Sequence, residues 1–192
     1  SEMWIRDSLI SASAVYPKIH ITNVNRQNPI NAPMFCMVLR KYLQSSKIIS
    51  IKQLSTDRVI IIDFQSPDDL GYESIYSLFI EIMGRHSNIT LIRKSDNIIM
   101  DSIKHVTPDI NTIRCLYPGI KFVYPPSSQK MDPFDFEFEE FYKKIMSMKD
   151  SIDEKLFLKL FTGVSKPLSK EMYTILNVKD IEINYENCKI MY

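Results

Sequence analysis

The chain has 192 residues, of which 45% are apolar and 24% charged, a balance typical of a folded globular protein and not of a disordered one. Its formal net charge of +1 excludes a general electrostatic attraction to nucleic acid or membranes, so binding of that kind has to be local. The sequence has no run of eighteen apolar residues and no basic-then-apolar N-terminal stretch, so it predicts neither a membrane span nor a secretory signal.

The first two thirds of the chain predict a β-rich region with one helix. Alternating or β-branched apolar residues are typical of strands, and the proline at the front of residues 33–43 favours the start of a helix. The last two strands are expected to form a hairpin around Ser95–Asn97. In chain order, strands are predicted over Lys18–Thr22, Lys47–Ser55, Arg58–Gln65, Ser74–Met83, Asn88–Lys94 and Asn97–Val106.

A proline-rich stretch separates this region from a helical one. Prolines at positions 118, 125 and 126 prevent a regular helix there and indicate a connection between two domains. We therefore expect a β-rich domain over residues 1–131 and a helical domain over residues 132–192. Helices in the second domain are predicted over Phe136–Met148, Asp153–Phe161 and Pro167–Leu176, with Asp153 as an N-cap.

The balance of charge reverses at the same boundary. Residues 1–131 hold fifteen Lys or Arg and eleven Asp or Glu, a balance of +4, whereas residues 132–154 hold three and eight, a balance of −5. Because carboxylates repel phosphates, we expect the acidic stretch to lie away from any face that binds RNA.

The residue patterns do not predict an enzyme. The three histidines lack the spacing of a metal site on one helix, and the four glycines form no phosphate-binding loop. The three cysteines form no zinc or redox motif, so we expect reduced, buried thiols at Cys36, Cys115 and Cys188. The sequence therefore predicts a binding domain with no catalytic residues, no cofactor and no metal.

Two polar segments interrupt the predicted strands. Thr56–Arg58 lies where one strand turns into the next, and Glu81–Asn88 ends one apolar strand and begins another. Guanidinium and imidazole groups at Arg58, Arg85 and His86 can donate to phosphates or base edges. Each segment also has a purely structural explanation, as a turn with an ion pair or as a bend.

At these positions the chain resembles a known family, the N-terminal domain of NFACT proteins. Bacterial members of that family include fibronectin-binding protein A and the RqcH-type ribosome quality-control factors. A dense block such as Gly84–Asn88 is far more specific than a three-residue motif. The matching stretches are Ala32–Leu43, Asp57-Arg58, Glu81–Asn88, Tyr117–Gly119 and Tyr124–Pro126, and the similarity continues into the helical tail.

The resemblance implies an α+β fold in which a β-sandwich, like the N-terminal domain of formamidopyrimidine-type DNA glycosylases, precedes a helix-two-turn-helix module. It also implies that the β-rich domain is N-terminally truncated. Leu156–Tyr173, with its break at Phe161–Ser165, matches the helical module. Glycosylase chemistry does not follow, because this chain opens with Ser1-Glu2-Met3 where those enzymes use an N-terminal proline amine.

The resemblance further implies a cytoplasmic RNA-binding domain of a ribosome quality-control factor. Such a factor binds a large ribosomal subunit obstructed by peptidyl-tRNA and recruits tRNA for C-terminal tailing of the stalled peptide. A nearly neutral domain fits this role, because unpaired RNA bases are read by arginine planes, aromatic faces and hydrogen bonds. The resemblance assigns tRNA binding to Asp57 and Arg58, and possible RNA contact to Arg85, His86, Ser87 and Asn88.

Three alternatives stay open. Lys166 and Lys170, beside the helix start after Gly163, can also meet an RNA backbone, although a capped, solvated helix end explains them as well. A fibronectin-binding surface adhesin is the main alternative function, but the unpaired cysteines argue against an oxidising exterior. A DNA-binding module derived from the glycosylase-like fold is another, and the weak net charge argues against it.

Overall fold

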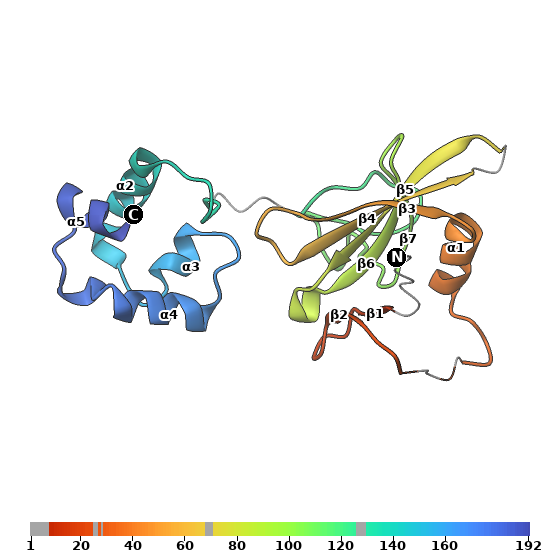
Figure 1. Ribbon diagram of the computed structural model, residues 1–192, viewed down its shortest axis with the longest axis horizontal. Coiled ribbons are helices and arrows are strands. Elements are labelled where there is room, and N and C mark those ends of the chain that lie inside the picture. Colours follow the sequence, from red (N-terminus) through yellow and green to blue (C-terminus); the bar gives the residue numbers. More distant parts are fainter. Residues whose placement is uncertain (1–7, 25–26, 28, 68–70, 126–129) are drawn as a thin grey trace, which may run out of the picture. The chain divides into compact units, whose positions relative to one another are not determined.

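The computed structural model describes residues 8–24, 27, 29–67, 71–125 and 130–192, so the matching stretch Tyr124–Pro126 lies partly outside the described residues (Figure 1). Contacts divide the described chain into two compact units. Unit 1 holds the residues up to Leu54 and Arg58–Pro125, and unit 2 holds Ser55–Asp57 and the residues after Pro125. The sequence predicted the domain boundary between residues 131 and 132, whereas the contacts place it after Pro125. The contacts also assign Ser55–Asp57, which lie between the third and fourth strands, to unit 2. Within the described ranges, no helix is long and apolar enough to cross a membrane.

Unit 1 is built on an antiparallel sheet of five strands in the order β3-β4-β5-β6-β7. Each strand pairs with the next one along the chain, so the sheet is an antiparallel meander. The β-branched run in β4 favours this extended conformation. The strands are β3 (Lys47–Gln53), β4 (Val59–Pro67), β5 (Glu73–Glu81), β6 (Asn88–Arg93) and β7 (Ile98–Ser102).

Both faces of this sheet carry buried side chains. On β4, Ile62 packs on one face and Ile61 on the other, because successive side chains of a strand alternate. The first face is covered by helix α1 (Met34–Leu43) and by the hairpin of β1 (Ser8–Ser11) and β2 (Lys18–Ile21), as Figure 1 shows. The loop around Leu116 and Phe122 covers the second face. The central strands are therefore enclosed by apolar layers.

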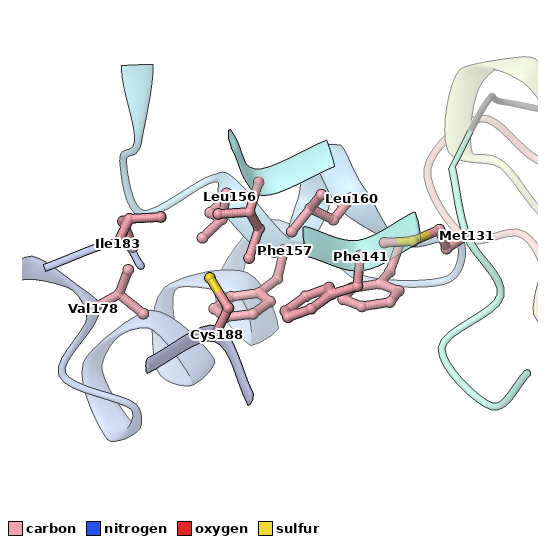
Figure 2. Close-up of a cluster of buried hydrophobic side chains, with 10 residues drawn as sticks. Met131, Phe141, Leu156, Phe157, Leu160, Val178, Ile183 and Cys188 are labelled. Atoms are coloured by element: carbon pink, nitrogen blue, oxygen red, sulfur yellow. The ribbon is translucent and has the colours of Figure 1, made fainter. Parts of the chain in front are cut away.

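Unit 2 is helical and has its own apolar core. Phe141 and Ile145 of one helix meet Leu156, Phe157 and Leu160 of another, and all five side chains are almost completely buried. Figure 2 shows most of this cluster, with Cys188 from the last helix beside the aromatic rings. The helices are α2 (Phe138–Ser147), α3 (Leu156–Leu160), α4 (Lys166–Ile175) and α5 (Tyr185–Met191). Together with the sheet of unit 1, they confirm the predicted α+β class.

The helix starts differ slightly from the predicted ones. Helix α3 begins at Leu156 and not at Asp153, because the carboxylate of Asp153 accepts from the Lys155 amide and from Lys159. Helix α4 has the capping residue Ser165, whose hydroxyl accepts from the amide of Leu168. Strand β1 and helix α5 were not predicted.

The expectation of buried thiols is wrong for two of the three cysteines. Cys188 is fully buried in the core of unit 2, and burial raises the pKa of its thiol. Cys36 on α1 and Cys115 in a loop are only half-buried, and the thiol of Cys115 donates to the carbonyl of Asn111. All three remain unpaired thiols.

Candidate RNA-binding site

The Asp57-Arg58 pair lies in the turn between β3 and β4. The amide of Leu54 donates to the carbonyl of Val59 at 2.9 Å and closes the turn, and Ser55 adopts a left-handed backbone with φ of 48°. Asp57 is half-buried and Arg58 is exposed. The hairpin therefore presents the arginine at one end of the sheet.

The Gly84–Asn88 block reaches the same end of the sheet. Val59, the first residue of β4, pairs with Glu81, the last residue of β5, so the turn after β5 follows directly beside the start of β4. The amide of Ile82 donates to the carbonyl of Arg58 at 2.8 Å and extends this pairing by one step. The two polar segments picked out from the sequence are thus neighbours in space, because the antiparallel pairing of β4 and β5 brings the start of one strand beside the end of the other.

Ser87 and Asn88 have internal roles in this turn. Both side chains are almost completely buried, with 1% and 3% exposed. The hydroxyl of Ser87 accepts from the Met83 amide at 2.9 Å. The Asn88 side chain accepts from the Lys104 amide at 3.1 Å and donates to the Lys104 carbonyl at 2.9 Å. Since these groups are already hydrogen-bonded inside unit 1, the predicted RNA contact of this block rests on its other members.

Arg85 and His86 are the exposed members of the block. They lie in a single 3-10 turn, Gly84–His86, which Gly84 opens with φ of +57°. The Nε of Arg85 donates to the Nε2 of His86 at 2.9 Å. The pair presents a planar guanidinium beside a planar ring, which suits phosphates and base edges.

Glu81, the first residue of this polar segment, belongs to the support of the turn. Its carboxylate is 2% exposed and forms an ion pair with Arg114 at 2.8 Å. Arg114 also donates to the carbonyl of Val123 and lies 5.1 Å from the ring of Phe122. Sequence reasoning missed Arg114, because it stands 33 residues from Glu81 and in no recognisable motif.

The residues just before Arg58, Ser55–Asp57, are hydrogen-bonded to other residues of unit 2, to which they belong. The Ser55 hydroxyl donates to Asp132 at 2.5 Å, and the hydroxyls of Thr56 and Thr162 are hydrogen-bonded. Hydrogen bonds from the Ser55 hydroxyl and from the backbone amide of Phe134 hold the pKa of Asp132 below its usual value. Asp132, the first residue of the acidic stretch 132–154, therefore binds the loop that carries Asp57. The expectation that this stretch lies away from an RNA-binding face stays a prediction.

Lys166 and Lys170 lie on helix α4 of unit 2. Lys166 is exposed at the first turn of the helix. Lys170 forms an ion pair with Glu154 at 3.3 Å. Their predicted contact with an RNA backbone stays a prediction. Among the described residues, no group of three or more His, Cys, Asp or Glu side chains is arranged to hold a metal ion.

Comparison with known proteins relates both units to one family. Residues 6–189 match the family described as NFACT N-terminal and middle domains. The chain is 36% identical over 163 residues to the Rqc2 homolog RqcH of Bacillus subtilis, which covers 85% of this chain and 28% of that protein. It is 33% identical over 135 residues to the archaeal Rqc2 homolog aRqcH of Methanocaldococcus jannaschii, covering 70% of this chain and 18% of that protein. The chain thus spans less than a third of these relatives.

Solved structures show the same fold. The N-terminal domain of fibronectin-binding protein PavA from Streptococcus pneumoniae superimposes with a TM-score of 0.74 at 35% identity, over 90% of this chain and 63% of that one. The N-terminal part of the fibronectin/fibrinogen-binding protein of Streptococcus suis gives a TM-score of 0.76 at 31% identity, over 95% and 66% of the two chains.

Proposed function

Because this chain belongs to the family of NFACT N-terminal and middle domains, we propose that it is the tRNA-binding part of a ribosome quality-control factor that acts in the cytoplasm. The complete protein would bind large ribosomal subunits obstructed by peptidyl-tRNA and recruit tRNA for C-terminal tailing of the stalled peptide. Relatives named as Rqc2 homologues support this assignment. The observation that carries the site is the convergence of Arg58, Arg85 and His86 at one end of the sheet.

The chemistry of these groups suits an unpaired loop of RNA. Arginine planes stack on bases or donate two parallel hydrogen bonds, and a carboxylate accepts from an exocyclic base amine. In our proposal Arg58 and Asp57 read a tRNA loop, while Arg85 and His86 contact its backbone or base edges. The chain contributes binding alone, and the ribosome performs peptide transfer.

The test uses the full-length protein with the double substitution Asp57→Ala/Arg58→Ala. Co-purifying tRNA should fall at least tenfold, whereas association with the large subunit and the folding of the protein should persist. A matched control is Arg93→Ala/Asp96→Ala, which removes an exposed Arg–Asp pair from the β6–β7 turn at the opposite end of the sheet. If both double variants retain tRNA, Asp57 and Arg58 form only a structural turn and the site assignment fails.

Fibronectin binding is the second candidate, because the names of two structural relatives state it. The same full-length variants distinguish the two functions when immobilised fibronectin and tRNA are offered in parallel. If the full-length protein binds immobilised fibronectin and shows no affinity for tRNA, fibronectin binding would take the place of our proposal. A duplex DNA ligand in the same series tests the DNA-binding alternative.

A further inference from the structure

Phe134 is unusual among the phenylalanines of this chain. The chain has ten, and nine of them are buried or half-buried, but the side chain of Phe134 is 89% exposed. An exposed ring of this size gains nothing from the core, so its exposure needs another explanation. Resting on the proposed function, we propose that Phe134 stacks on an unpaired base of the tRNA loop that Asp57, in the same unit, recognises.

The turn that carries Phe134 is closed by hydrogen bonds. The amide of Phe134 donates to the Oδ1 of Asp132 at 3.0 Å, and the amide of Asp135 donates to the carbonyl of Asp132 at 3.2 Å. Pro133, between them, has its φ fixed by its ring. The exposed ring therefore stands on a turn that is already ordered, which lowers the entropy lost when a ligand binds.

The base of this turn is anchored in the core of unit 2. Met131 is 4% exposed and forms one end of the apolar cluster in Figure 2. Its amide donates to the carbonyl of Leu160 at 2.8 Å, and its carbonyl accepts from the amide of Thr162 at 2.9 Å. The position of the Phe134 turn is therefore set by the packing of helix α3.

The carboxylate of Asp132 connects the Phe134 turn to the proposed tRNA-binding loop. Oδ1 of Asp132 holds the amide of Phe134, and Oδ2 accepts from the hydroxyl of Ser55, two residues before Asp57. The Thr56–Thr162 hydrogen bond fixes the loop from a second side. Phe134 and Asp57 thus belong to one compact unit and are separated by a short, hydrogen-bonded path.

The charges around Phe134 favour a base over a phosphate. Asp132 and the exposed Asp135 flank the ring, and their negative charge repels the RNA backbone. A base is neutral, its face stacks on an aromatic ring, and its amines donate to carboxylates. A protein partner fits less well, because a single ring between carboxylates lacks the apolar core of a protein interface.

The experiment compares Phe134→Ala and Phe134→Trp in the full-length protein. Loss of one stacked base is expected to weaken tRNA binding by roughly 5- to 150-fold. The tryptophan variant, which keeps an aromatic face, should bind as tightly as the wild type. Ile113→Ala removes an exposed apolar side chain from unit 1 and is the matched control. Equilibrium binding of labelled tRNA gives the affinities, and circular dichroism verifies the fold.

The Asp57→Ala/Arg58→Ala variant is measured beside these to separate the two proposals. If it loses tRNA and Phe134→Ala does not, the stacking role is refuted and the tRNA-binding function stands. If all variants bind tRNA like the wild type, both proposals fail. If Phe134→Ala keeps tRNA but loses the ribosomal subunit, the ring contacts another partner and the stacking role is refuted.

Discussion

A substitution at Gly163 tests how closely the loop that carries Asp57 packs against the rest of unit 2. Its backbone has φ of +71°, a left-handed conformation in which an L side chain costs about 1–2 kcal/mol. A Cβ at this position would also lie 2.7 Å from the carbonyl oxygen of Thr56. That atom belongs to the backbone, so the loop itself would have to move, and overpacking of this kind costs roughly 1–3 kcal/mol more.

Gly119→Ala is the matched control, because it introduces the same strain without the close contact. Gly119 has φ of +87°, and a Cβ there would meet no atom within 4 Å. We expect Gly119→Ala to lower the local free energy of opening by about 1–2 kcal/mol and Gly163→Ala by about 2–5 kcal/mol. The difference between the two variants isolates the contact with Thr56.

Native-state hydrogen exchange measures these losses separately in each unit. In Gly163→Ala the amides of α3 and α4 should exchange faster, and tRNA affinity should fall as Thr56 is displaced. In Gly119→Ala the faster exchange should be confined to the sheet of unit 1. Equal losses in the two variants would refute the argument, because they would leave only the backbone strain that both share.

Two further predictions concern buried polar groups in unit 1. Asn88→Ala leaves the Lys104 amide and carbonyl without their partner, so urea unfolding should show a loss of about 2–3 kcal/mol, against almost none for the exposed Asn23→Ala. Burial raises the pKa of Asp63, but hydrogen bonds from Lys94 and Ser77 outweigh it and the net pKa is lowered. The ionised Asp63 therefore stabilises the fold above the unfolded pKa of about 3.9, and this contribution disappears as the pH falls through the lowered value. The stability gap between the wild type and Asp63→Asn should narrow below about pH 4 in urea unfolding, and a gap that does not depend on pH would contradict this.

The sheet was largely predictable because its strands carry strong local signals. The β-branched run of β4 and the apolar stretch of β5 leave few other conformations, and all four of their ends lie within two residues of the predicted bounds. β1 and α5 were missed since each is short and contributes few buried side chains. The start of α3 was misplaced because Asp153 caps a turn before the helix.

The candidate site was predictable only in its exposed parts. Arg58, Arg85 and His86 stand out in the sequence because polar residues interrupt apolar strands there. Their supports do not stand out, since Lys104 lies 16 residues from Asn88 and Asp132 lies 77 residues from Ser55. Hydrogen bonds over such separations depend on how the strands and helices pack, and no local pattern records them.

The Gly84–Asn88 block illustrates why a specific motif need not be a contact surface. Two of its five residues, Ser87 and Asn88, are buried and hold the turn, and Gly84 supplies a left-handed backbone. Only Arg85 and His86 are exposed to a ligand. The block therefore identifies the family mainly through the fold that it stabilises. An alanine substitution at Ser87 or Asn88 that abolished tRNA binding would report on the turn, and only substitutions at the two exposed residues test recognition itself.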